Sequence, residues 1–270
     1  KNLSMELNAD LIIDDKSGFL FDRIFKRKKA LPKNLNYKKI NLIDLFWFHI
    51  LLLIKKIFYK KQIFLNLKNQ VLIDETNQKK FINNFFKITK SYKKIFLVGF
   101  FQSEKYFAQN KRIIISEILK NKIKNKKIKK IINRVNKKSV CIGIRMFEEA
   151  PIDIRNKFGG VENFDFYNRA ISNIKKKVQK PIFFIFSSKK NLNKQKNKIE
   201  TKAYYIDNFE DRINDFDILL LISSFSNFII SNSSYYWWGA YLANHKKKIK
   251  IVVSKKFTNI NTIPNIWKTN

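Results

Sequence analysis

A polar turn followed by two adjacent tryptophans has the clearest chemical potential in the chain. Segment 228–242 reads as an apolar strand, a polar turn and then an aromatic helix. Three residues form the turn: Asn232, Ser233 and Ser234. Asn and Ser are preferred at helix N-caps, and the free amides at a helix start favour an anion. The turn is therefore a candidate anion site, although by local pattern alone an ordinary capped helix with two core Trp residues is the favoured interpretation. Because adjacent Trp237 and Trp238 face different ways on a helix, we expect Trp238 to line the cleft.

A cation stands at the end of a second apolar run. Residues 140–144 are apolar or Gly, and Arg145 follows them directly. A charge at the mouth of a buried strand needs an anionic partner, and a guanidinium can bridge two phosphoryl oxygens. Arg145 therefore predicts a diphosphate site, while a salt bridge to Glu148 or Glu149 explains its presence equally well.

Segment 99–107 mixes amide, hydroxyl and carboxylate groups with aromatic rings. Such groups suit the hydroxyl-rich surface of a sugar, and the candidates here are Phe101, Gln102, Ser103 and Glu104. A helix capped by Ser103 explains the same residues equally well.

The elements that would position these groups are most regular in the second half of the chain. We expect strands at 140–144, 181–186, 203–206, 227–231 and 249–253, and helices at 166–178, 218–222 and 232–242. Short apolar strands alternating with helices predict a parallel sheet covered on both faces. Ligands of such sheets bind beyond the carboxyl ends of the strands. That rule points at Arg145, Ser187, the residues 231–234 and Ser254.

The first half is predicted to be mixed. We expect strands at 9–14, 71–74 and 95–99, helices at 42–54 and 78–89, and a basic helical connection at 111–138. A length of 270 residues favours two domains. The fold class is therefore α/β, with a domain 1–137, incomplete at its start, and a domain 138–270.

Composition restricts the function classes. The formal charge of +35 attracts phosphate, yet only eight of the 56 basic residues are Arg, the residue suited to bidentate phosphate and guanine contacts. We therefore interpret most of the charge as solvated surface. One Cys excludes an internal disulfide and a multi-cysteine zinc site, which suits a reducing cytoplasm, and with two His a catalytic metal would need carboxylates.

The apolar helix expected at 42–54 is too short to span a bilayer. A buried helix is the favoured interpretation. A helix that docks at an anionic membrane surface is the alternative, since Lys55, Lys56, Lys60 and Lys61 follow it.

In their order and spacing along the chain, the segments 99–107, 140–145 and 228–242 together resemble the α-1,2-fucosyltransferase family. Its members carry a Gly-Tyr-Phe-Gln-Ser-like segment, a strand ending His-x-Arg-Arg-x-Asp, a Phe-Ser-Asp-Asp segment and the sequence Asn-Ser-Ser-x-Ser-Trp-Trp-Gly-Ala. The matching stretches are 99–107, 140–149, 184–188 and 229–242.

The chain also departs from the family pattern. The family's His falls at Gly143, its second Arg at Met146 and its Asp at Glu148, while Ser188 and Lys189 replace the acidic pair. The family's glycine-rich opening would precede Lys1, so we expect an N-terminally truncated member.

The resemblance implies two facing Rossmann-like domains (GT-B-like), with the nucleotide held by the C-terminal one. It implies inverting transfer of fucose from GDP-fucose to a sugar hydroxyl of a surface glycan, in α-1,2 linkage, with no cofactor or essential metal. Arg145 and the 232–234 amides would stabilise the departing diphosphate. Glu148, then Glu149, and last Glu104 are the candidate bases.

Other interpretations stay open at this point. The same fold could use another donor sugar, and a non-catalytic basic protein could bind nucleic acid or glycans. The Asp215-x-Asp217 pattern matches metal motifs of other glycosyltransferases, but a helix start is the favoured interpretation. We expect a nucleotide sugar and an oligosaccharide acceptor as partners, no specific nucleic acid, and a cytoplasmic protein with peripheral contact to the inner membrane face.

Overall fold

The structure is a computed structural model that describes residues 1–14, 36–147, 151–157, 159–188, 191–193, 198–207, 214–246 and 249–267. Its internal contacts divide the chain into two compact units. Unit 1 takes the described residues within 1–14, 36–114 and 259–262, and unit 2 those within 115–258 and 263–267. The chain is thus of mixed α/β class, as predicted, and two facing domains divided at residue 137 stay a prediction.

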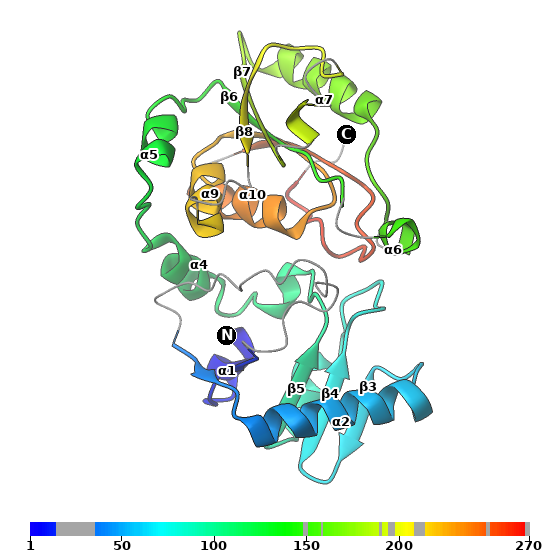
Figure 1. The fold of residues 1–270 in the computed structure, drawn as a ribbon. Coiled ribbons are helices and arrows are strands. Elements are labelled where there is room, and N and C mark those ends of the chain that lie inside the picture. The colour runs from blue at the N-terminus through cyan, green and yellow to red at the C-terminus, as the bar shows by residue number, and fades with distance from the viewer. Residues whose placement is uncertain are drawn as a thin grey trace. The chain divides into compact units, whose positions relative to one another are not determined.

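Unit 2 is built on a five-stranded sheet in which every strand pairing is parallel (Figure 1). Its strands are β6 (Ser139–Gly143), β7 (Ile182–Ser187), β8 (Ala203–Asp207), β9 (Asn227–Ile230) and β10 (Lys250–Val253). Their spatial order is β10-β9-β6-β7-β8. The order therefore reverses direction between β6 and β9, and ligands of open α/β sheets bind beyond the carboxyl ends of the strands at such a point. The predicted parallel sheet is confirmed.

Helices cover both faces of this sheet. Helix α7 (Phe164–Lys177) buries the stripe Tyr167, Ala170, Ile171 and Ile174 in one core with Phe183 and Ile185 of β7. Phe184 and Phe186 point to the opposite face, because side chains alternate along a strand. There Phe225 packs on both rings, directly after α9 (Asp215–Ile222). Helix α10 (Ser234–Lys246) lies beside α9 and follows β9.

The basic stretch 111–138 is not one helix, contrary to the prediction. It contains α4 (Lys111–Leu119) and α5 (Lys126–Ile132). The Asn125 side chain accepts from the amides of Lys127 and Ile128, at 2.8 and 3.2 Å. An Asn that caps a new helix start competes with helix continuation, which explains the break. Helix α6 (Ile152–Lys157), which the sequence did not suggest, follows β6.

Unit 1 contains a three-stranded sheet, with an antiparallel hairpin and one parallel pairing. The strands are β3 (Phe64–Leu67), β4 (Gln70–Asp74) and β5 (Lys94–Val98). Helix α2 (Leu42–Phe58) lies along one face of this sheet (Figure 1). The remaining short elements are α1 (Asn2–Glu6), β1 (Ile12–Ile13), β2 (Lys38–Lys39), α3 (Phe85–Thr89) and η1 (Glu104–Tyr106).

Two predictions for unit 1 need correction. The helix expected at 78–89 is limited to α3, because tertiary partners take the preceding amides. Phe81 N donates to the Asn261 side chain at 2.9 Å, and Ile82 N donates to the Tyr106 hydroxyl at 3.2 Å. The expected strand 9–14 is likewise only the two-residue β1, and strand β3 was not anticipated.

Helix α2 is buried on one face only. Leu51 is fully buried and packs with Leu65 and Leu72 of the sheet, whereas Ile43 is 81% exposed and Phe46 is 70% exposed. The expectation of a buried helix therefore holds only for the face that carries Leu51 and Lys55, the two buried residues of α2. Among the described residues, no helix has the length and apolarity needed to cross a membrane.

Candidate functional site

The two principal sequence motifs meet where the order of the unit 2 sheet reverses. Gly143 at the end of β6 is paired in register with Ile230 at the end of β9. Just beyond, the Ser231 hydroxyl donates to Gly143 O at 3.2 Å and accepts from the amide of Arg145 at 3.1 Å. Arg145 and the start of the 231–234 turn are thus hydrogen-bonded neighbours, although they are 86 residues apart in the chain.

Helix α10 begins at this junction. Trp237 N donates to Ser233 O at 2.9 Å, which is the first turn of the helix, and Ser234 is its first residue and is exposed. The first amides of a helix have no acceptor within the helix and form the positive end of its dipole. The beginning of α10 and the backbone of Arg145 therefore lie at the ends of neighbouring strands, at the edge where parallel sheets bind their ligands.

The guanidinium of Arg145 lies over an aromatic ring. Its Cζ atom is 4.6 Å from the ring centroid of Phe147. Phe147 has a φ of 51°, in the left-handed region that bulky residues rarely adopt. The predicted acids Glu148 and Glu149 lie outside the described residues.

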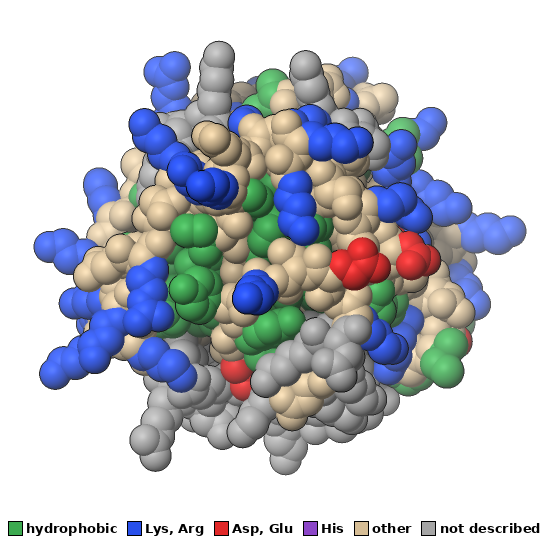
Figure 2. Space-filling model, turned by 90° about the horizontal axis from the view of Figure 1, so that it is seen from above, with side chains coloured by type: hydrophobic (Ala, Val, Ile, Leu, Met, Phe, Trp, Pro, Cys, Tyr) green, Lys and Arg blue, Asp and Glu red, His purple; other side chains and the backbone are tan. Residues whose placement is uncertain are grey.

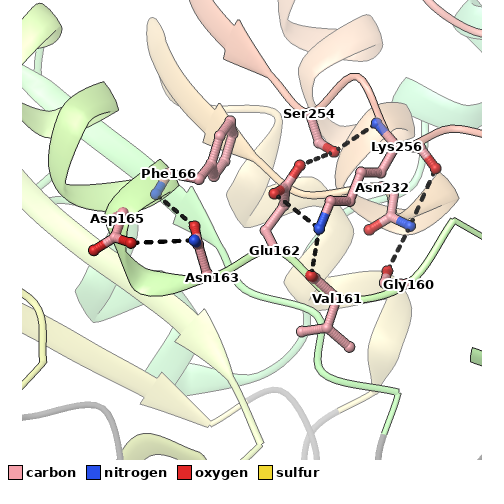
Figure 3. A network of polar contacts seen from close by, with 9 residues as sticks. All are labelled: Gly160, Val161, Glu162, Asn163, Asp165, Phe166, Asn232, Ser254 and Lys256. Carbon is pink, nitrogen blue, oxygen red and sulfur yellow. Dashed lines mark hydrogen bonds and ion pairs between the residues drawn. The ribbon is translucent and has the colours of Figure 1, made fainter. Parts of the chain in front are cut away.

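A network of polar contacts supports the turn from the side of β10 (Figure 3). The Asn232 amide nitrogen donates to Gly160 O at 3.0 Å and to Lys256 O at 3.4 Å. Gly159 has a φ of +90°, and a Cβ there would come within 1.8 Å of Lys256 O. Only a glycine admits this close approach. Asn232, predicted to contact the donor, therefore also joins a glycine-containing loop to the end of β10.

Glu162 is a buried acid of this network that sequence reasoning missed. Its carboxylate accepts from the Ser254 hydroxyl at 2.5 Å and lies 3.5 Å from the Lys256 ammonium (Figure 3). Lys256 also donates to Val161 O at 2.7 Å. Ser254 was expected near the site from its place after a strand, and Glu162 is its partner. The only signal for Glu162 was its position just before α7.

The other predicted donor-side residues also lie at the carboxyl edge of the sheet or on α10. Ser187 is buried, and its hydroxyl donates to Ile144 O at 3.3 Å. Trp237 is buried and stacks on Tyr241, with ring centroids 4.5 Å apart, whereas Trp238 is half-buried. The two tryptophans therefore differ in exposure, and Trp238 is the one with an accessible surface.

A buried carboxylate organises the sugar-side candidate segment of unit 1. The Glu75 carboxylate, directly after β4, accepts from the amides of Phe100 and Phe101 at 3.0 and 2.9 Å, and from the Asn259 side chain at 3.3 Å. Burial raises the pKa of Glu75, against the lowering effect of these three donors. Gly99 has a φ of +137° and would clash with Glu75 if it carried a Cβ. Sequence reasoning did not identify Glu75.

The four predicted residues of this segment have different environments. The Phe101 ring packs against Phe85 and Tyr106 in the core of unit 1. Ser103 is buried and caps η1, so the alternative interpretation of a helix cap is confirmed. Gln102 is half-buried, and the Glu104 carboxylate lies 3.4 Å from the Lys111 ammonium.

The Asp-x-Asp pattern is a helix start, as favoured from the sequence. Asn214 caps α9, and Asp215 is its first residue. The Asp217 carboxylate accepts from the amides of Lys124 and Asn125, at 3.2 and 2.9 Å from Oδ2. Within the described ranges, no cluster of three His, Cys, Asp or Glu side chains could hold a metal ion.

Comparison with known proteins agrees with the resemblance in the motifs. A sequence profile described as Glycosyl transferase family 11 matches residues 17–261. No curated protein and no solved structure shows significant similarity to the chain. The profile spans the Arg145 strand end, the 231–234 turn and the segment 99–107. The chain therefore belongs to glycosyl transferase family 11, the α-fucosyltransferase family, and is a glycosyltransferase.

Proposed function

We propose that the protein transfers fucose from GDP-fucose to a sugar hydroxyl of a surface glycan, in α-1,2 linkage and with inversion. The donor sugar and linkage follow from the family and from the resemblance in the motifs. The observation that carries the proposal is the junction of Arg145 with the start of α10 at the carboxyl edge of a parallel sheet. A nucleoside diphosphate is the ligand class that this combination suits best.

The residues of this junction would act on the leaving group. When the bond to fucose breaks, negative charge develops on the diphosphate, and fixed positive charge near it lowers the barrier. Arg145 and the amides of residues 232–234 would supply such charge without a metal. The acceptor hydroxyl must lose a proton as it attacks. Glu148 is the first candidate for this base, Glu149 the second and Glu104 the third.

The test is transfer or hydrolysis of GDP-fucose by the purified protein in EDTA. Arg145→Ala should lower kcat/KM by roughly 100-fold or more, the usual loss when one group that stabilises transition-state charge is removed. Arg134→Ala removes an exposed Arg elsewhere in unit 2 and serves as the matched control. Equal activity of the two variants would contradict the role of Arg145, and activity that requires added Mg²⁺ would contradict the metal-free mechanism.

A second candidate is the same chemistry with another donor sugar. It is favoured by two departures from the family pattern. Gly143 ends the strand before Arg145, and Met146 directly follows Arg145. Thermal shifts with GDP, UDP and GDP-mannose separate the two candidates. Stabilisation by UDP but not by GDP would replace GDP-fucose as the donor.

The face of the molecule seen in Figure 2 gives little support to specific nucleic-acid binding. Figure 2 shows Lys and Arg side chains scattered over the visible face rather than gathered in one stripe. A nucleic-acid footprint is usually a clustered basic patch. Tight, salt-sensitive binding of random RNA, with no thermal shift from GDP, would favour the binding-protein alternative.

We also propose that unit 1 contacts the anionic inner face of the membrane through α2. The exposed face of this helix carries the large apolar residues Leu42, Ile43, Phe46, Leu53, Ile57 and Phe58. The exposed cations Lys56, Lys60 and Lys61 lie at its C-terminal end. The single acid of the helix, Asp44, is paired with Lys94. An apolar face beside lysines complements anionic lipid.

Vesicle sedimentation tests this contact. The protein should bind vesicles that contain phosphatidylserine and not neutral phosphatidylcholine vesicles, and Ile43→Ser with Phe46→Ser should abolish binding. Tyr204→Ser removes an exposed apolar side chain of β8 and is the control. If the double variant binds vesicles like the wild type, the contact is wrong. If it instead converts a dimer to a monomer, the face binds a second copy of the chain.

A further inference from the structure

Gly143 must be a glycine because of a neighbouring side chain and not because of its own backbone conformation. It ends strand β6 in regular register with β7 and β9, and its φ is not in the left-handed region. Any L-residue could adopt this backbone. A Cβ at this position, however, would lie 2.4 Å from Cγ of Tyr236 and within 2.7 Å of both Cδ atoms. The ring of Tyr236 lies directly against Gly143 and excludes every side chain there.

Tyr236 reaches from the first turn of α10 to the ends of two strands. Its side chain is buried. Its hydroxyl donates to Phe186 O of β7 at 2.9 Å and lies 3.3 Å from a second acceptor, Ile144 O. The ring rests on the end of β6. One side chain thus connects the beginning of the helix to β6 and β7, on the side of the junction where Arg145 begins.

We propose that Tyr236 is a positioning residue for the nucleoside diphosphate, and that Gly143 is required to admit its ring. By fixing the first turn of α10 against the strand ends, Tyr236 places the helix amides where they meet the phosphates beside Arg145. This inference rests on the proposed function for its ligand, but the coupling of Gly143 with Tyr236 does not.

Thermal unfolding of four proteins tests the coupling: the wild type, Gly143→Ala, Tyr236→Ser and the double variant. Gly143→Ala should lower the Tm strongly in the wild-type background, because the added Cβ meets the ring. The same change should leave the Tm unchanged or raise it in the Tyr236→Ser background. If Gly143→Ala alone does not fold while the double variant does, the coupling is also supported. An equal loss of Tm in both backgrounds overturns it.

Calorimetric binding of GDP tests the positioning role with a matched pair of variants. Tyr235 and Tyr236 are adjacent, and each hydroxyl donates to a backbone carbonyl, that of Tyr235 to Asp215 O at 2.5 Å. Tyr236→Phe should weaken GDP binding, because the first turn of α10 is then no longer held to Phe186 O. Tyr235→Phe, whose bond leads to α9 instead of the strand ends, should leave the affinity unchanged.

The two ways in which this test can fail are distinguishable. If the wild type binds GDP and both phenylalanine variants bind it equally well, the positioning role is wrong and the proposed function stands. If the wild type does not bind GDP at all, the proposed function and the positioning role both fail. The unfolding series still decides the coupling of Gly143 with Tyr236.

Discussion

Substituting Asp217 should destabilise unit 2 without changing any metal dependence. The carboxylate is only 7% exposed and accepts from the amides of Lys124 and Asn125. Asn125 in turn caps α5. A net hydrogen bond to a charged group contributes about 1.5–3 kcal/mol. Asp217→Ala removes two such bonds, and the longer one, from Lys124, contributes at the lower end of this range or below it. We therefore expect the substitution to lower the free energy of unfolding by about 3 kcal/mol.

Thermal unfolding is the assay, and Asp215→Ala is the matched control. For a chain of this size, about 3 kcal/mol corresponds to a Tm lowered by roughly 6–12 °C. Asp215 is exposed, and its backbone carbonyl, which accepts from Tyr235, survives the substitution. Its removal should change stability by less than about 0.5 kcal/mol. Asp217→Asn keeps one acceptor oxygen, so its Tm should fall between those of the wild type and Asp217→Ala.

The same variants distinguish a helix start from a metal motif. If the Asp-x-Asp pair bound a metal, both alanine variants would lose activity together, and the loss would depend on the Mg²⁺ or Mn²⁺ concentration. An equal loss of activity in both variants, with the Tm of Asp217→Ala unchanged, would refute the structural role. We expect the opposite: a large difference in Tm between the two and activity in EDTA for Asp215→Ala.

Three further predictions concern buried groups. Lys55→Met should lower the free energy of unfolding in urea titrations by up to about 3 kcal/mol, because it leaves the half-buried Asp74 without its ammonium partner at 2.9 Å. Adding Asp74→Asn should recover most of this loss. Burial opposes ionisation of Asp74, but hydrogen bonds from Lys55 and Thr76 hold its pKa below 3.8. The stability that ionised Asp74 contributes is therefore present above pH 3.8 and lost as the pH falls through the native pKa. Burial raises the native pKa of Glu75 above 4.5, so the stability that protonated Glu75 contributes is complete below pH 4.5 and lost as the pH rises through the native pKa. Glu75→Gln should remove this decline in stability from unfolding curves measured over a series of pH values. Burial also raises the pKa of the Cys141 thiol, so iodoacetamide at pH 8 should label it only after unfolding.

The parallel sheet was predictable because its strands are buried on both faces. Continuous apolar runs such as 182–187 in β7 are a strong local signal, and turn residues separate them from helices with clear stripes. Their order in space was not predicted, because right-handed crossovers restrict the possible orders without selecting one. The meeting of Arg145 with Ser231 is a consequence of that order, since both follow strands that become neighbours.

The helix boundaries that failed were decided by distant partners. The amides of Phe81 and Ile82 are held by Asn261 and Tyr106, which are 180 and 24 residues away. A helical pattern in the sequence competes with such bonds and loses when the partners are fixed by a core. No local property of residues 78–84 reports these contacts.

Partners that are distant in the sequence also explain why two buried acids, Glu162 and Glu75, were not predicted. Glu162 is satisfied by Ser254 from 92 residues away, and Glu75 by Asn259 from 184 residues away. Each joins a loop at the carboxyl edge of its sheet to the C-terminal part of the chain. The Glu162 carboxylate accepts a bond from the Ser254 hydroxyl and lies beside the Lys256 ammonium, so it holds its loop in place. Glu162 therefore joins the supporting structure of the site, and the search for the base that deprotonates the acceptor should begin with Glu148 and Glu149, which follow Arg145 closely in the sequence.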